Sequence, residues 1–481
     1  MNILDLSSIN LGPLDANDDE HLPEYFVSFG DFENLVRKNR FIVVGAKGTG
    51  KSAIKKHLCE NRRKAGKMTI DLDDSLGFSL SQIKTTSPAE VKNKMKGYIM
   101  SLILNHLSTS DDILDLDKKK IDKLKESIPL IQKLLTPLTL KAEGVVEYAI
   151  KDLFPKQKQG DLVRMLDPSV SATINAVLRN KDLWILIDDI DSVFTSDSIE
   201  SSLRFVEGLI YAASDLSVRA FRKSVWILLL LRSEIYEELT RKATELDKEV
   251  TYIWEIVWDA EALKKCLAER IRWAFKEKKG KASWKYWSLL FDVSSEKDVE
   301  KLQNYLLERI INGPRDLLLL VELSRKTACK HSANKMKLKH IQESEYDYGK
   351  IKLRQITSNF QRIYWEIDRV IDRLFRKGQQ FYTRAGLEKH INDNLLTDPV
   401  ARDDFKELKW LRTCSSFLFI QILYRIGCIG YWDPPKRRYI YVLERLSPNR
   451  TLAKSTKFKL HSALAEYLEL KTPSSEKKSR K

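Results

Sequence analysis

A glycine-rich segment near the N-terminus carries residue types that bind a nucleoside triphosphate. Residues 45–52 read Gly-Ala-Lys-Gly-Thr-Gly-Lys-Ser, a complete P-loop pattern. Glycines let successive backbone N–H groups surround the phosphates, Lys51 brings a positive charge to the β- and γ-oxygens, and the Ser52 hydroxyl can ligate Mg²⁺. The expected nucleotide-binding residues are Gly45, Lys47, Gly48, Thr49, Gly50, Lys51, Ser52 and Ala53.

Two carboxylates follow a second apolar run and complete a Walker B pattern. Residues 183–187 are Leu-Trp-Ile-Leu-Ile, and Asp188 and Asp189 come directly after them. A strand buried on both faces would deliver these carboxylates beside the P-loop, where Asp188 can hold Mg²⁺ and Asp189 can orient the attacking water. The alternative is that they only cap the turn after the strand.

Two arginines are candidates for sensing the γ-phosphate. Arg232 ends the apolar run 224–231, and Arg315 lies in a Gly-Pro-Arg-Asp sequence that opens a helix. An ion pair with Glu234 is the alternative for Arg232, and a surface capping turn is the alternative for Arg315. The predicted catalytic residues are therefore Lys51, Asp189, Arg232 and Arg315. We expect ATP and Mg²⁺ as cofactors, because no Asn-Lys-x-Asp motif follows the later strands to select guanine.

Alternating strand-like and helix-like segments are expected to position these residues. Apolar runs at 41–44, 68–72, 183–187, 224–231 and 251–258 are separated by helical patterns, including a long helical insertion at about 87–180. This order predicts an α/β fold with a mostly parallel sheet and helices on both faces.

The C-terminal third has a different pattern, typical of a winged helix. A helical stretch at 338–393 and helices at 402–412 and 415–426 precede strands at 428–432 and 439–443. The turn between these strands carries Lys436, Arg437 and Arg438, which are possible nucleic-acid contacts. However, the 415–426 helix is too apolar to read base edges in a groove, so a protein-docking or structural role stays open.

Charge is concentrated in the same region. The net charge is +16, and residues 330–481 contain 32 Lys and Arg against 17 Asp and Glu. This asymmetry indicates an acidic partner such as DNA, or simply a basic solvated surface. No apolar run approaches membrane-spanning length and no signal peptide is evident, so we expect a cytoplasmic protein without membrane contact. The five widely spaced cysteines are expected to be reduced and mostly buried.

The order of these motifs resembles the AAA+ and STAND branches of the P-loop ATPases, especially replication-initiator-like ATPases that end in a winged helix. More closely, the sequence is similar to a little-characterised bacterial family often found near antiviral defence genes. The segments that carry this resemblance are 14–16, 25–27, 45–53, 231–234, 313–317 and 426–431.

The resemblance implies an ASCE/AAA+-like P-loop NTPase core with a helical lid and a C-terminal winged helix. Its expected domains are an N-terminal arm (1–39), a core (40–260), a lid (261–337), a helical and winged-helix domain (338–470) and a disordered basic tail (471–481). Arg232 would be the strand-end sensor and Arg315 the lid sensor. Asp189 stands where many AAA+ proteins have the longer Glu, so hydrolysis is expected to be slow, and Arg241 is a weak candidate for a finger toward a neighbouring subunit.

Three functions are consistent with this pattern. The first is an ATP-driven switch in bacterial antiviral defence that forms a homo-oligomer or controls a separate effector protein. The second is an initiator or regulator that binds DNA under the control of ATP. The third is a nucleotide-binding scaffold without turnover.

Overall fold

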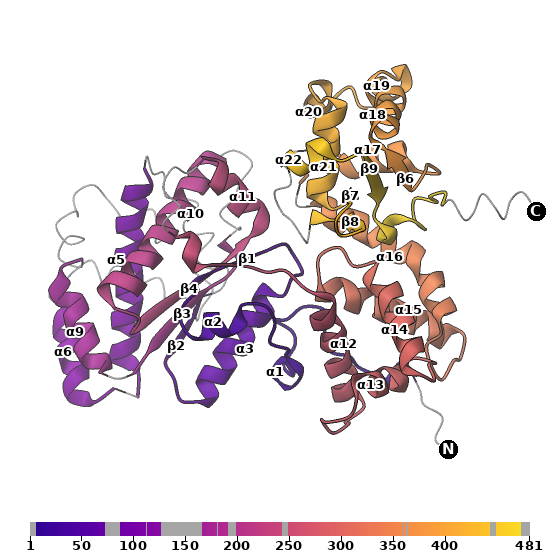
Figure 1. The fold of residues 1–481 in the computed structure, drawn as a ribbon. Helices are drawn as coiled ribbons and strands as arrows, with labels where there is room; N and C mark the ends of the chain where they lie inside the picture. Colours follow the sequence, from indigo (N-terminus) through magenta and orange to yellow (C-terminus); the bar gives the residue numbers. More distant parts are fainter. Residues whose placement is uncertain are drawn as a thin grey trace, which may run out of the picture. The chain divides into compact units, whose positions relative to one another are not determined.

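The chain folds into two compact units. One unit spans Ser28–Ile256, and the other combines Met1–Val27 with Val257–Lys481. In the computed structural model (Figure 1), the described residues are 6–72, 87–111, 113–126, 166–179, 181–190, 199–242, 249–358, 360–361, 364–442 and 449–472. Most of the expected tail, about half of the helical insertion and Asp191 lie outside these residues.

The unit Ser28–Ile256 is built on a five-stranded sheet in the order β2-β3-β4-β1-β5. All neighbouring strands pair in parallel. The central strands are almost entirely buried and consist of Val, Ile and Leu with a few tryptophans, because helices cover both faces. The strands are β1 (Ile42–Gly45), β2 (Thr69–Leu72), β3 (Leu183–Ile187), β4 (Val225–Arg232) and β5 (Ile253–Glu255).

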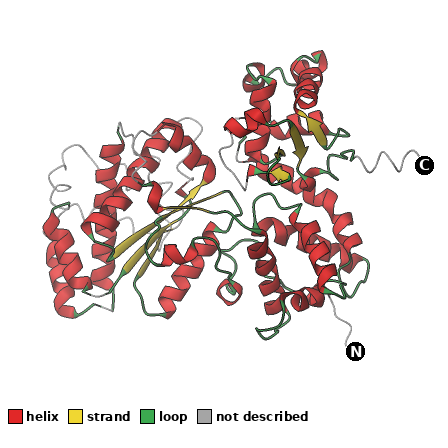
Figure 2. Cartoon of the chain, viewed as in Figure 1, coloured by secondary structure: helices red, strands yellow, loops and turns green. Residues whose placement is uncertain are grey.

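Helices lie on both sides of this sheet, as Figure 2 shows. One side carries α2 (Phe32–Val36) and α3 (Lys51–Lys64), and the other carries α5 (Pro88–Thr109) and α10 (Ile199–Ser214). Gly208 permits a close approach of α10 to α5, because a Cβ there would lie 2.5 Å from the Val91 Cβ. The helices α6 (Asp115–Glu126) and α9 (Pro168–Leu178) pack beside α5. The predicted α/β class with a parallel sheet is confirmed.

A network of ion pairs lies at the amino-terminal edge of the sheet and joins β3 to α3. Asp182, just before β3, pairs with Lys38 at 2.9 Å and with Arg62 of α3 at 3.2 Å. Burial alone would raise the pKa of the Asp182 carboxyl, but the hydrogen bonds and charges of Arg62 and Lys38 outweigh it and lower that pKa well below its usual range. This network fixes the end of the sheet opposite to the P-loop.

The second unit contains a helical part and a small sheet. The helical part consists of α12 (Ala260–Ala274), α13 (Ser283–Leu290), α14 (Glu296–Leu307), α15 (Pro314–Lys330) and α16 (Leu338–Ser358). The remainder contains α17 (Ile367–Phe375), α18 (Arg384–Ile391), α19 (Pro399–Asp404), α20 (Lys409–Arg412), α21 (Ser416–Ile426) and α22 (Asn449–Lys454). Its sheet has the order β6-β9-β7-β8, with β6 (Phe381–Thr383), β7 (Ile429–Asp433), β8 (Arg438–Ile440) and β9 (Lys457–Leu460).

The N-terminal segment belongs to this second unit, where arginines of α12 and α15 hold its backbone. Arg270 donates to the Leu11 carbonyl at 2.8 Å and pairs with Asp19 at 3.1 Å, and both charged side chains are buried. Arg325 donates to the Leu6 carbonyl at 2.7 Å. Guanidinium groups thus hold this segment through its backbone carbonyls.

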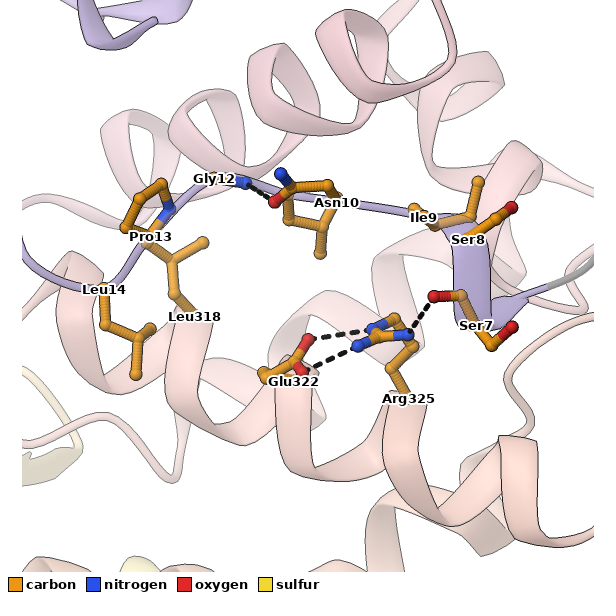
Figure 3. A pocket seen from close by; sticks show the side chains of 11 residues that line it. Ser7, Ser8, Ile9, Asn10, Gly12, Pro13, Leu14, Leu318, Glu322 and Arg325 are labelled. Atoms are coloured by element: carbon orange, nitrogen blue, oxygen red, sulfur yellow. Dashed lines mark hydrogen bonds and ion pairs between the residues drawn. The ribbon is translucent and has the colours of Figure 1, made fainter. Parts of the chain in front are cut away.

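A groove of about 420 Å³ lies between residues 7–14 and α15 (Figure 3). Its α15 side is formed by Leu318, Glu322 and Arg325. Glu322 binds the Arg325 guanidinium through two contacts, at 2.8 and 2.7 Å. The arginine is therefore fully engaged by its own helix and by the N-terminal segment.

Two sequence predictions in the C-terminal part were wrong in detail. The single helix predicted at 402–412 is broken into α19 and α20, because Phe405 and Leu408 turn into the core between them. The helical stretch predicted at 338–393 is interrupted by β6. This strand pairs with β9, which comes much later in the sequence. The predicted hairpin is present, with Asp433 paired to Arg438 across its turn.

The cysteines are free, and Cys59, Cys414 and Cys428 are buried, in agreement with the prediction of reduced thiols. Among the described residues, no helix is long and apolar enough to cross a membrane.

Candidate functional site

The P-loop lies between β1 and α3, where a strand leads in and a helix leads out as predicted. Gly48 and Gly50 have φ values of +87° and +95°, which L side chains rarely adopt. At Gly45 a Cβ would lie 2.4 Å from the Thr49 Oγ1. The loop therefore requires glycine at these positions, and its turn directs backbone N–H groups toward the space in front of α3.

The side chains of the loop are arranged around this turn. Lys51 Nζ donates to the Gly45 carbonyl at 2.8 Å and to the Ala46 carbonyl at 3.2 Å. Ser52 and Ala53 are half-buried in the first turn of α3, whereas Lys47 is exposed at the tip of the loop. Thr49 is buried, and its hydroxyl donates to Ala46 at 2.8 Å. Lys51 thus folds over the loop that would bind the phosphates.

The sheet register brings Arg232 to the P-loop. Gly45, the last residue of β1, is paired with Arg232, the last residue of β4. Parallel strands end at one edge of the sheet, and ligands of open α/β sheets bind outside this carboxyl edge. Arg232 therefore lies at the correct edge and on the neighbouring strand.

Asp188 and Asp189 follow β3, on the other side of β4. Asp188 is 4% exposed, and its Oδ1 accepts a hydrogen bond of 2.9 Å from the Asp189 N–H. Asp189 is half-buried with φ +54°, a left-handed conformation uncommon for a residue other than glycine. The buried Asp188 carboxylate offers the oxygen ligands that Mg²⁺ prefers.

Arg315 belongs to the other unit, where it is the second residue of α15. Its Nη2 lies 3.1 Å from Asp15, and its Nε donates to the Leu14 carbonyl at 3.3 Å. The structure therefore places Arg315 at a helix N-terminus, as predicted, and shows it bound to the N-terminal segment.

Sequence reasoning missed the residues that fix the turn before Arg315. One carboxylate oxygen of Asp316 accepts from the N–H groups of Ile311 and Asn312, at 3.1 and 2.7 Å. Its other oxygen lies 2.6 Å from Lys352 Nζ of α16, and this pair is almost completely buried. An aspartate in the first helical turn is a signal readable from sequence, but no local pattern identifies Lys352.

Four further predicted residues are divided between the two units. Lys436 and Arg437 are exposed on the turn that joins β7 to β8 in the second unit, and Arg438 is exposed at the start of β8. Arg241 lies near the end of α11 (Ser233–Lys242) in the unit Ser28–Ile256.

Comparison with known proteins finds a matching domain family and a similar protein. Residues 261–357 match the family model of the FunZ-associated C-terminal helical domain, which covers α12 to α16. The putative transposon gamma-delta 80.3 kDa protein of Escherichia coli (strain K12) is 24% identical over 471 residues. The match covers 92% of this chain and 64% of that protein, so the chain spans less than two thirds of the relative's length.

Solved structures of ORC proteins are distantly similar to this chain. The Aeropyrum pernix ORC1 protein in complex with DNA has a TM-score of 0.38 and 12% identity, and covers 94% of each chain. The Aeropyrum pernix ORC2 protein in its ADP form has a TM-score of 0.32 and 12% identity, covering 91% of this chain and 89% of that one. Likeness at this level does not transfer an activity.

Proposed function

We propose that this protein is an ATPase that uses ATP binding and hydrolysis as a molecular switch. The observation that carries the proposal is the convergence of the P-loop, Asp188 and Arg232 at the carboxyl edge of one parallel sheet. In this arrangement Lys51 and the loop N–H groups bind the phosphates, and Ser52 and Asp188 hold Mg²⁺.

In the proposed chemistry, Asp189 orients the attacking water and Arg232 senses the γ-phosphate. The short Asp189 side chain reaches less far than a glutamate would, so turnover is slow. Arg315 is the proposed second sensor of the γ-phosphate. This last role requires Arg315 to exchange Asp15 for phosphate.

Nucleotide binding tests the proposal directly. We expect Lys51→Ala to reduce the affinity for a fluorescent ATP analogue by at least tenfold, because the loop loses its charge on the β- and γ-phosphates. Lys64→Ala is the matched control, since Lys64 is exposed in the last turn of the same helix. Equal affinities of the two variants would refute the P-loop assignment.

Phosphate release then separates a switch from a scaffold. Asp189→Asn should retain ATP binding and lose most of the basal phosphate release. Unchanged release would remove Asp189 from the mechanism, and absence of release from the unmodified protein would favour a nucleotide-binding scaffold.

The biological role proposed for the switch is control of oligomer assembly or of a separate effector in bacterial antiviral defence. This part rests on the motif resemblance. The mass of the protein measured with ATP and Mg²⁺, with ADP, and for Lys51→Ala tests it: assembly that requires ATP and Lys51 supports an oligomerising switch.

The second candidate function is DNA binding controlled by ATP through a winged helix. The exposed basic turn at Lys436, Arg437 and Arg438 favours it. The burial of most apolar residues of α21 opposes a groove-reading helix. A change in mass only after duplex DNA is added, abolished by neutralising the turn, would support this function over the first.

A further inference from the structure

One face of the small C-terminal sheet combines aromatic and basic side chains. Alternate residues of a strand point to opposite faces, and Phe458 and Leu460 of β9 and Tyr431 of β7 point into the buried core. The paired register assigns the intervening residues to the outer face. These outer residues are Phe381, Thr383, Gly430, Trp432, Tyr439, Lys457 and Lys459.

The aromatic rings of this face contact one another. The ring centroids of Phe381 and Tyr439 are 5.9 Å apart, and those of Trp432 and Tyr439 are 5.2 Å apart. The Phe381 side chain is 38% exposed, while Trp432 and Tyr439 are half-buried. The rings therefore form a continuous aromatic row, anchored at one side and open to solvent at Phe381.

Positive charges surround the row. Lys459 Nζ lies 5.4 Å from the Phe381 ring centroid, and Lys457 is exposed two residues earlier on the same strand. Lys436 and Arg437 are exposed on the turn that follows Trp432. Within the described part of the chain, these four side chains form no ion pair. The carboxylate of Glu308, at the end of α14, faces Lys459.

Because alternate residues of a strand lie on opposite faces, the nearby carboxylate of β7 is placed on the face opposite to the aromatic row. Asp433, paired with Arg438, has the parity of the opposite face. The row thus offers aromatic rings beside cations that form no ion pair within the described residues. Bases stack on such rings, and the phosphates that link them contact such cations.

We propose that this aromatic face binds single-stranded nucleic acid. A duplex hides the faces of its bases, whereas a single strand exposes them for stacking on Phe381 and Tyr439. This inference goes beyond the proposed ATPase switch and does not depend on it. It also differs from groove reading by a winged helix, because the contacts are made by the sheet.

The test measures binding of the full chain to a labelled 20-nucleotide oligo-dT and to a duplex of the same length, by fluorescence anisotropy at low salt. We expect oligo-dT to bind more tightly than the duplex. Phe381→Ala should weaken oligo-dT binding about tenfold, the loss typical of one stacked base. Trp365→Ala is the matched control, since Trp365 is an exposed aromatic residue of the same unit that lies outside the sheet.

A charge variant provides the second measurement. Lys457→Glu should weaken binding and reduce the slope of log affinity against log salt, because a phosphate contact is lost. Lys350→Glu, at an exposed lysine of α16, should leave that slope unchanged.

Several results would overturn the inference. These are no detectable binding of oligo-dT, equal or tighter binding of the duplex, or equal losses in Phe381→Ala and Trp365→Ala. ATP-analogue binding by each variant is measured in parallel and should be unchanged. A failure of the P-loop assignment in Lys51→Ala therefore cannot be confused with a failure of this surface.

Discussion

The buried pair Lys352–Asp316 makes a quantitative prediction about the turn that carries Arg315. The two side chains are 1% and 3% exposed, and their charged atoms are 2.6 Å apart. Replacing Lys352 by Met keeps most of the side-chain volume but leaves the Asp316 carboxylate buried without its cation. Loss of one partner of a buried pair costs about 3–5 kcal/mol.

Two further variants separate this charge effect from a loss of packing. The double change Asp316→Asn with Lys352→Met removes both charges, and the Asn oxygen can still accept from the N–H groups of Ile311 or Asn312. We expect it to recover at least about 2 kcal/mol of the loss, because replacing both members of a buried pair is much less costly than removing one. Lys350→Met, at an exposed position of the same helix, should stay within about 0.5 kcal/mol of the unmodified protein.

Hydrogen exchange measured by mass spectrometry is the appropriate assay, since it reports the opening free energy of α15 and α16 separately from the rest of the chain. Urea denaturation followed by circular dichroism gives the global value. A loss below about 1 kcal/mol in Lys352→Met would refute the reasoning, as would a double variant no more stable than the single one.

Three other changes have defined outcomes. Burial, followed by the charges of Lys459 and Lys352, lowers the pKa of His461 to about 3. The free energy of unfolding should therefore be fully retained above pH 6.5 and fall below this pH by up to about 1.4 kcal/mol per pH unit. His461→Gln should flatten the dependence of the urea midpoint on pH between pH 7.5 and 5, and an unchanged slope would contradict this. Asp182→Asn should cost about 2 kcal/mol through weakened bonds to charged partners, measured by thermal denaturation, with no change in ATP affinity. Arg270→Met should release the N-terminal segment and accelerate its cleavage by chymotrypsin at its leucine and aromatic residues, and an unchanged cleavage rate would show that the remaining contacts suffice.

The core of the unit Ser28–Ile256 could be predicted from the sequence because its signals are local. The P-loop, the apolar run ending at Asp188 and the run ending at Arg232 each mark a buried strand and its carboxyl end. Once the strands are known to be parallel, their ends must share an edge. The observed bounds of β3 equal the predicted ones, and those of β1, β2 and β4 differ by one residue at most, whereas β5 is shorter than the apolar run at 251–258.

The second unit could be read only in part, because its organisation depends on contacts between distant residues. The sequence around Leu6 and Leu11 carries no signal that arginines some 260 to 320 residues later bind the carbonyls of these residues. Likewise, the alternating Lys and apolar residues at 457–460 do not indicate that β9 lies between β6 and β7 in the sheet. The lysine partner of Asp316 lies 36 residues away on another helix, at a spacing that no periodic pattern encodes.

The attachment of residues 6–25 to α12 and α15 also has a consequence for synthesis of the chain. The segment leaves the ribosome before Arg270 and Arg325, which follow only after the whole unit Ser28–Ile256 has been made. At ordinary rates of translation this delay is about 10 to 50 s. The unit Ser28–Ile256 therefore has time to fold before residues 6–25 meet their partners, and the second unit can bind this segment fully only when the chain has passed Arg325.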